Sequence, residues 1–138
     1  MNIVTGHDEA VARWVSDIIG KPFHAPFTAF GFVDNAGRLR GGCVFTTYTG
    51  PSINLSLAGS ACLTRGAWRA IIDYVFRQLG CVRLEVHTRR GNKLVSRTAT
   101  RLGFRFEGTA RRLYGDADGM CYSIVDTDLP AFRARWRI

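Results

Sequence analysis

Residues 59–108 read GSACLTRGAWRAIIDYVFRQLGCVRLEVHTRRGNKLVSRTATRLGFRFEG, and this stretch holds the most regular hydrophobic pattern of the chain. Its first part repeats apolar residues at intervals of three and four, as one face of a helix does. The residues of this face are Trp68, Ile71, Ile72, Val75, Phe76 and Leu79. The spacing predicts one amphipathic helix that continues through Leu79.

The remainder of the stretch predicts a strand, a second helix and another strand. Residues 81–88 alternate between apolar and polar side chains, which is typical of a half-buried strand. The apolar side of this strand carries Val82, Leu84 and Val86, and the polar side carries Arg83, Glu85 and His87. A second helix is expected from about Asn92 to Gly103, and residues 104–111 then predict another strand.

The loop that precedes the first helix, GSACLTRG, consists of small and polar residues. Thr64 is placed to cap the helix that follows. The first N–H groups of a helix have no acceptor within the helix, and the helix dipole favours negative charge at that end. The loop therefore predicts an anion site, and phosphate is the anion that we expect.

Three short motifs follow one another in this stretch. They are Arg83-Leu84-Glu85 in the strand, Asn92 with Ser96 at the start of the second helix, and Leu102, Gly103, Phe104, Glu107 and Gly108 after it. In this order the motifs resemble the GNAT superfamily of acetyl-CoA-dependent acyltransferases. Within it, the sequence looks closest to the branch that acetylates protein N-terminal amines. The resemblance covers about half of the chain.

The segments outside this stretch complete a pattern of ten elements. A short strand or arm at residues 2–6, a helix over residues 7–19, a hairpin turning at residues 34–37 and a strand at residues 51–60 come first. Two strands around the turn GDADG come last, before a short helical tail with Arg133, Arg135 and Arg137 exposed. The order β-α-β-β-β-α-β-α-β-β is also the one that the resemblance implies. We expect an α+β fold of α/β/α type, with a central, mixed, mostly antiparallel twisted sheet between helices, and one domain over residues 1–138.

The composition restricts the kinds of partner that the protein could have, but it does not identify a function. The 138 residues include 19 Lys and Arg against 11 Asp and Glu, a net charge of +8. This excess would attract nucleic acid, acidic protein surfaces or a phosphorylated cofactor, or would form a solvated basic surface. The sequence has neither a transmembrane run nor a secretory signal pattern, so we expect a cytoplasmic protein without a membrane partner.

The cysteines and acidic residues do not predict a metal site. The four cysteines are widely spaced without a C-x-x-C pair, which favours reduced, packed thiols. Cys62 lies in the anion loop, but no neighbouring base marks it as a nucleophile. Asp116 and Asp118 lack the further oxygen ligands of a calcium loop, so a plain turn is expected there.

The resemblance implies acetyl-CoA as the cofactor and assigns residues to it. The phosphate loop of the family corresponds to a shorter, less glycine-rich version here, made of Cys62, Leu63, Thr64, Arg65, Gly66 and Ala67. The strand before it, including Leu57 and Ala58, would pair with the pantetheine arm. Asn92 would cap the second helix and bond the same arm. Lys93 and Arg97 belong to a basic stripe that either meets a cofactor phosphate or forms a solvated face.

The resemblance also implies how the leaving thiolate is protonated. Many members of the superfamily place a tyrosine four residues before the glycine of L-G-F, and this chain has Ala99 there. Ser96 matches the serine that the N-terminal acetyltransferase branch offers near the thiol. Tyr114 is the second candidate for this proton donor.

Glu85 is the leading candidate for the general base, with His87 and Glu107 as alternatives. At pH 7, deprotonation costs about 1.4 kcal/mol for an α-amine and about 4.6 kcal/mol for a lysine. A site without an evident strong base therefore favours an amine of low pKa.

Three functional hypotheses follow. The first is an acetyl-CoA-dependent N-acetyltransferase that acts by direct transfer on a protein N-terminus or a small amine. The second is a nucleic-acid-directed protein on the same fold, which we favour less because aromatic residues do not interleave with the basic clusters. The third is a silent CoA-binding module, suggested by Ala99 and the reduced phosphate loop. The strand-rich C-terminal segment adds the expectation of a homodimer.

Overall fold

The computed structural model describes residues 2–138. The strands are β1 (Asn2–Val4), β2 (Thr28–Val33), β3 (Leu39–Thr46), β4 (Ser52–Ala58), β5 (Arg83–Arg89), β6 (Arg105–Ala110) and β7 (Gly119–Val125). The α-helices are α1 (Asp8–Ile19), α2 (Arg65–Ile72), α3 (Lys93–Leu102) and α4 (Leu129–Trp136). Shorter helical segments are η1 (Ser60–Leu63), η2 (Asp73–Gln78) and η3 (Asp126–Asp128). The predicted order of strands and helices is confirmed.

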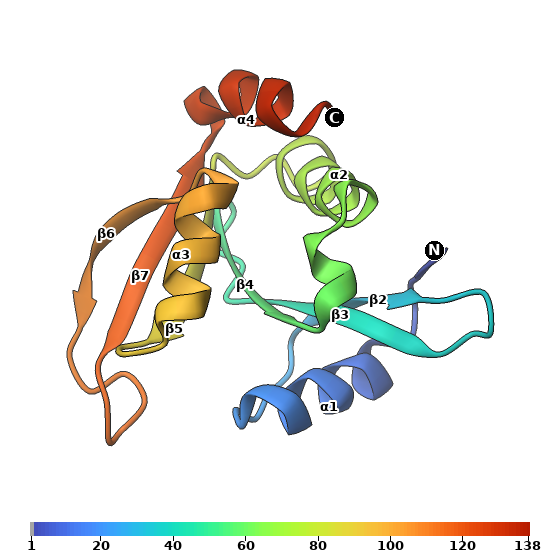
Figure 1. Ribbon diagram of the computed structural model, residues 1–138, viewed down its shortest axis with the longest axis horizontal. Helices are drawn as coiled ribbons and strands as arrows, with labels where there is room; N and C mark the ends of the chain where they lie inside the picture. The colour runs from blue at the N-terminus through green and yellow to red at the C-terminus, as the bar shows by residue number, and fades with distance from the viewer. Residues whose placement is uncertain (1) are drawn as a thin grey trace.

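All seven strands form one sheet in the order β1-β2-β3-β4-β5-β7-β6. Every neighbouring pair is antiparallel except β4 and β5, which run parallel. The predicted α+β class, with a mixed and mostly antiparallel sheet, is therefore confirmed. In Figure 1, α1 lies on one face of the sheet and α2 on the other.

The parallel pair divides the sheet into two halves. β4 and β5 are in register only from Ser52 with Arg83 to Asn54 with Glu85. Beyond these residues β4 continues with β3, and β5 continues with β7, so the two strands diverge (Figure 1). The gap opens toward the C-terminal ends of both parallel strands, where α/β proteins commonly bind ligands.

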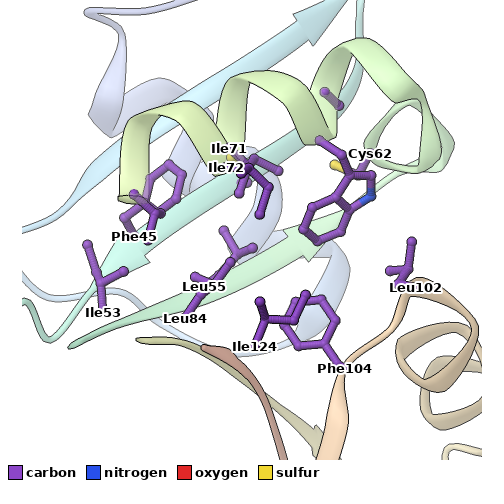
Figure 2. Packing of buried hydrophobic residues seen from close by; sticks show 14 of the residues in the cluster. Phe45, Ile53, Leu55, Cys62, Ile71, Ile72, Leu84, Leu102, Phe104 and Ile124 are labelled. Atoms are coloured by element: carbon purple, nitrogen blue, oxygen red, sulfur yellow. The ribbon is translucent and has the colours of Figure 1, made fainter. Parts of the chain in front are cut away.

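The larger core lies between α2 and the sheet (Figure 2). Trp68, Ile71, Ile72 and Val75 are completely buried, as the helical spacing predicts. The predicted helix is confirmed from Arg65 to Gln78, but its form changes along its length: α2 ends at Ile72 and the chain continues as a π-helix. The N–H of Leu79 accordingly bonds the carbonyl of Tyr74, five residues back.

A smaller core lies under α1 on the opposite face, where Val11 and Val15 pack against β2, β3 and β4. Gly42 on β3 allows this close approach, since a Cβ atom there would lie 2.8 Å from Cγ2 of Val15. The longest α-helix, α1, has 12 residues, and no helix within residues 2–138 is long and apolar enough to cross a membrane.

Two side-chain predictions are wrong. Val82 was expected on the buried side of β5, but it precedes the strand and is 46% exposed. Its N–H and carbonyl instead bond the chain at Pro51 and Asp126. Arg133 was expected to be exposed; α4 places it half-buried, with its guanidinium 3.0 Å from the carboxylate of Asp73.

Candidate active site

A cavity of about 620 Å³ occupies the gap between β4 and β5. Its walls come from β4, β5, η1, α3 and the end of α1, with Tyr114 from the β6–β7 connection. Pairing between the two strands stops at Asn54, so the β5-facing edge of β4 beyond it has no strand partner among residues 2–138. Backbone groups of Ser56–Ala58 at such an edge are available to an extended ligand. The predicted cofactor residues Leu57 and Ala58 both line the cavity.

The predicted phosphate loop folds as η1 followed by the capped start of α2. Oγ1 of Thr64 accepts a hydrogen bond from the N–H of Ala67 at 3.2 Å. Cys62 and Leu63 line the cavity, whereas Thr64 and Ala67 lie outside its lining. Arg65 and Gly66 also lie outside the lining; both are exposed on the first turn of α2, where helix N–H groups lack intrahelical acceptors.

Cys62 is a packing residue. Its side chain is buried, and Sγ lies 3.2 Å from the carbonyl oxygens of Gly42 and Ala58. Burial raises the pKa of this thiol to about 11, so at neutral pH it stays protonated and is a poor nucleophile.

Helix α3 presents one apolar flank to the cavity. Asn92 caps the helix, with Oδ1 accepting from the N–H of Val95 at 3.2 Å, and Asn92 lines the cavity. The cavity-facing side chains of α3 are Leu94, Val95, Thr98, Ala99 and Leu102. Ser96, Lys93 and Arg97 lie outside this lining, because the 3.6-residue repeat rotates them to other flanks. The structure thus gives Ser96 no position on the cavity wall.

The cavity rim is unusually apolar for a surface. Five of its lining residues are large hydrophobic side chains that remain exposed: Ile18, Ile19, Leu63, Leu94 and Val95. Leu94 is the most exposed, at 76%. Exposed apolar side chains that gather around one cavity indicate a surface that a ligand covers.

Glu85 belongs to an ion-pair cluster next to the cavity. The guanidinium of Arg83 donates to Glu85 at 2.8 Å and to both carboxylate oxygens of Glu107, at 2.6 and 2.8 Å. These contacts raise the pKa of Arg83, and the hydrogen bond from Arg83 lowers the pKa of Glu107. Glu107 is therefore held as a carboxylate, and the side-chain oxygens of both Glu85 and Glu107 are already engaged.

His87 joins this cluster to the cavity, which it lines from β5. The side-chain amide of Asn54 lies 3.4 Å from Nδ1 of His87 and 3.4 Å from Oε1 of Glu85. Nε2 of His87 lies 3.6 Å from the same Glu85 oxygen. This geometry favours the tautomer with the proton on Nε2, directed toward Glu85, and an acceptor on Nδ1 that faces the amide of Asn54. Burial lowers the pKa of His87, so the ring is neutral at pH 7.

Three further cavity residues carry polar groups, and no pattern in the sequence indicated that they would lie together. Asn54 is a buried polar residue in the middle of β4, and its alternation with Ile53 and Leu55 was the only signal. Lys21 lies directly after α1, half-buried, with Nζ 5.7 Å from the ring centre of Phe23. Trp68 lies at the inner wall, and its Nε1 is the one buried side-chain N or O atom without a hydrogen-bond partner among residues 2–138.

Tyr114 enters the cavity from the long connection between β6 and β7. The guanidinium of Arg89 lies 5.1 Å from the centre of its ring, and Arg89 also pairs with Asp116 at 2.7 Å. Burial raises the pKa of Tyr114, so the phenol is protonated at neutral pH. Of the three predicted catalytic residues, only Tyr114 lines the cavity.

No family model and no curated protein matches this sequence. Solved structures do match. A GCN5-related N-acetyltransferase from Brucella melitensis superposes with a TM-score of 0.69 and 26% identity, over 80% of this chain and 56% of that one. This chain thus spans little more than half of the Brucella protein.

Two more distant structures share the same fold. A mutant form of the spermidine/spermine N-acetyltransferase SpeG from Vibrio cholerae matches over 94% of this chain and 97% of its own, with a TM-score of 0.71 and 13% identity. The ribosomal-protein-S5-alanine acetyltransferase from Vibrio fischeri matches over 74% of this chain and 63% of its own, with a TM-score of 0.62 and 19% identity. These similarities establish the GNAT-like fold and do not resolve a branch within it.

Proposed function

Because the chain has a GNAT-like fold, we propose that it is an acetyl-CoA-dependent N-acetyltransferase that acetylates a primary amine by direct transfer. The observation that carries the proposal is the cavity between the diverging strands β4 and β5. A free strand edge, an apolar rim and a neutral imidazole meet in this one place. Direct transfer agrees with the buried, protonated state of Cys62, which leaves no activated thiol in the cavity lining.

The residues of the cavity fit an extended thioester cofactor. The free edge of β4 at Ser56–Ala58 would pair with the amides of the pantetheine arm. Leu63, Leu94 and Val95 would cover its apolar parts. The exposed N–H groups at the start of α2 would face the phosphates, with Arg65 beside them and Lys93 and Arg97 as further cations. Bound acetyl-CoA would supply the thioester whose carbonyl carbon the amine attacks, with cleavage of the carbon–sulfur bond.

We assign the general base to His87. A neutral imidazole accepts the amine proton at Nδ1, in place of the long contact with Asn54. Glu85 then stabilises the imidazolium through Nε2, and Arg83 holds Glu85 in position. In this proposal Glu85 orients the base and does not itself take the proton.

We assign the general acid to Tyr114, which would deliver a proton to the leaving thiolate. Its raised pKa keeps the phenol protonated until the thiolate forms. Ser96, the donor that the resemblance suggests, lies on a flank of α3 outside the cavity lining. Tyr114 is also held in place by the guanidinium of Arg89.

The weak base restricts the acceptor. The pKa of His87 lies below its ordinary value of 6.5. Proton transfer from an α-ammonium of pKa about 7.7 to such a base is uphill by at least about 1.6 kcal/mol, and from a lysine by at least about 5 kcal/mol. The site therefore favours α-amines and other amines of low pKa over lysine side chains.

Calorimetric titration with acetyl-CoA, together with thiol release in the presence of a peptide α-amine, tests this function. His87→Gln should lower kcat by roughly 10²-fold and leave acetyl-CoA affinity unchanged. Arg38→Gln, an exposed residue of the β2–β3 turn, serves as the matched control. Absence of acetyl-CoA binding would overturn the proposal. Binding without acetylation of any amine would instead identify a silent CoA-binding module.

A further inference from the structure

The fully charged side chains that line the cavity are both cationic, and the carboxylates of Glu85 and Glu107 lie outside the lining. Lys21 and Arg89 are the cationic side chains of the lining, and no Asp or Glu within residues 2–138 belongs to it. Arg89 already has a counterion in Asp116, at 2.7 Å. Lys21 has no ion pair within residues 2–138. The cavity therefore holds one ammonium group whose charge the described residues do not balance.

The fold holds Lys21 in this position. Gly20 closes α1 in the left-handed conformation, so the chain turns sharply and Lys21 follows at the cavity wall. The ammonium lies against the ring of Phe23 and is half-buried. A partly desolvated charge without a counterion is costly, and an anionic group in the cavity would offset that cost.

The position of Lys21 indicates that this anion belongs to the acceptor substrate and not to the cofactor. Lys21 and His87 both line the cavity, and the positive charge of Lys21 contributes to the lowered pKa of His87. Alternation along β5 directs His87 to the face that α1 covers, since Leu84 and Val86 belong to the α2 core. The start of α2, where we place the cofactor phosphates, lies on the opposite face (Figure 1). An anion beside Lys21 is thus near the proposed base and away from the proposed phosphate site.

We propose that the acceptor is a primary amine that also carries a carboxylate or phosphate, and that Lys21 binds this anionic group. This inference rests on the proposed function and adds the substrate class. A polycation such as spermidine does not suit the site, because Lys21 and Arg89 repel it and the lining offers no carboxylate to bind it. Charge-assisted hydrogen bonds from Lys21 would hold the anion and point the amine toward Nδ1 of His87.

The test compares acceptors that differ only in charge. The dipeptide amides alanyl-aspartate and alanyl-asparagine present the same α-amine with and without a carboxylate. The dipeptide amides alanyl-phosphoserine and alanyl-serine form the corresponding phosphate pair on the same α-amine, and spermidine is the polycation. With the full chain and acetyl-CoA, at least one anionic member should show a kcat/KM about tenfold or more above its neutral partner, and the favoured pair identifies the anion.

Variants of Lys21 connect this preference to one side chain. Lys21→Met should abolish the preference by lowering kcat/KM for the anionic acceptor only, and Lys21→Arg should retain most of it. Arg38→Met removes one positive charge away from the cavity and should leave the preference intact. Acetyl-CoA binding is measured separately, so its absence would mean that the proposed function fails. If acetyl-CoA binds but no anionic amine is acetylated, or neutral amines or spermidine are better acceptors, the inference about Lys21 is wrong.

Discussion

The two halves of the sheet differ in what covers their faces. The half formed by β1–β4 is covered by α1 on one face and α2 on the other, and its strands are largely buried. In the half formed by β5, β7 and β6, one face packs into the α2 core. The other face carries the half-exposed ion pairs of Arg83, Glu85 and Glu107. One half thus supplies a rigid wall, and the other supplies ionisable groups beside the cavity.

This difference follows from the side chains on each face, which are apolar in the enclosed half and charged beside the cavity. Apolar side chains enclosed between helix and sheet gain free energy from burial alone. Partly buried charged side chains are costly unless partners compensate their charge, and Arg83 compensates both carboxylates. Substitutions in the α2 core should therefore change stability, and substitutions of the ionisable residues that line the cavity should change turnover.

The largest expected effect is on stability, from Trp68→Ala. Trp68 is completely buried, and its ring packs edge-on against Phe104 and Phe132 at 5.8 and 6.0 Å. Removal of the indole should lower the free energy of unfolding by about 3–5 kcal/mol in urea denaturation. Tyr48→Ala removes an aromatic ring that is 55% exposed and should cost less than about 1 kcal/mol. Equal losses from the two variants would contradict the assignment of stability to the α2 core.

The next effect concerns turnover. Tyr114→Phe should lower kcat by roughly 10²-fold with little change in KM for acetyl-CoA, because the hydroxyl would act only in the transition state. Thermal unfolding of the variant should match that of the unchanged protein, which separates chemistry from folding. Ser96→Ala tests the alternative proton donor in the same assay. A large loss of kcat in Ser96→Ala, with none in Tyr114→Phe, would return the role of proton donor to Ser96.

The sequence predicted the order of strands and helices because periodicity and capping residues are local signals. Thr64, Asn92 and Gly103 cap their helices as their positions in the sequence suggest. Local signals did not reveal that α2 continues as a π-helix, because the apolar spacing is almost the same in both forms. The packing of the ring of Tyr74 against Phe30 and Phe45, from two different strands, depends on tertiary structure.

The cavity was less predictable than the fold because its residues come together only through tertiary structure. Lys21, Asn54 and His87 come from three separate segments, and only the register of β4 with β5 brings two of them into contact. Asn92 was found because a helix cap has a sequence signature. Ser96 was selected by its spacing in a motif, and the rotation of α3 turns it away from the cavity lining.

A smaller effect is expected from the cap of α3, which borders the cavity. Oδ1 of Asn92 accepts the N–H of Val95, so Asn92→Ala should lower the free energy of unfolding by about 1 kcal/mol. Asn92→Asp keeps an acceptor at the same position and should lose much less. In calorimetric titration, Asn92→Ala should also weaken acetyl-CoA binding if this side chain bonds the pantetheine arm. Unchanged affinity would leave Asn92 with the capping role alone.

The smallest expected effect is a pH-dependent one, from Glu107→Gln in the ion-pair cluster. The hydrogen bond from Arg83 is the main cause that lowers the pKa of Glu107 below 4.5 in the folded protein. A carboxylate with a depressed folded pKa adds stability above its unfolded pKa and loses it as pH falls through the folded value. Glu107→Gln should therefore lower Tm by about 2–4 °C at pH 7, and the difference should shrink below about pH 4. The effect is small because the Glu107 side chain is 39% exposed and water screens the pair.

The dependence on salt concentration provides a second test of the Tm difference caused by Glu107→Gln. Added salt should reduce the Tm difference at pH 7, since partly exposed ion pairs are screened. Asp126→Asn provides a matched control, because Asp126 is exposed and belongs to none of the ion pairs among residues 2–138. A Tm difference for Glu107→Gln that persists unchanged to pH 3 would show that the stabilisation comes from packing rather than charge.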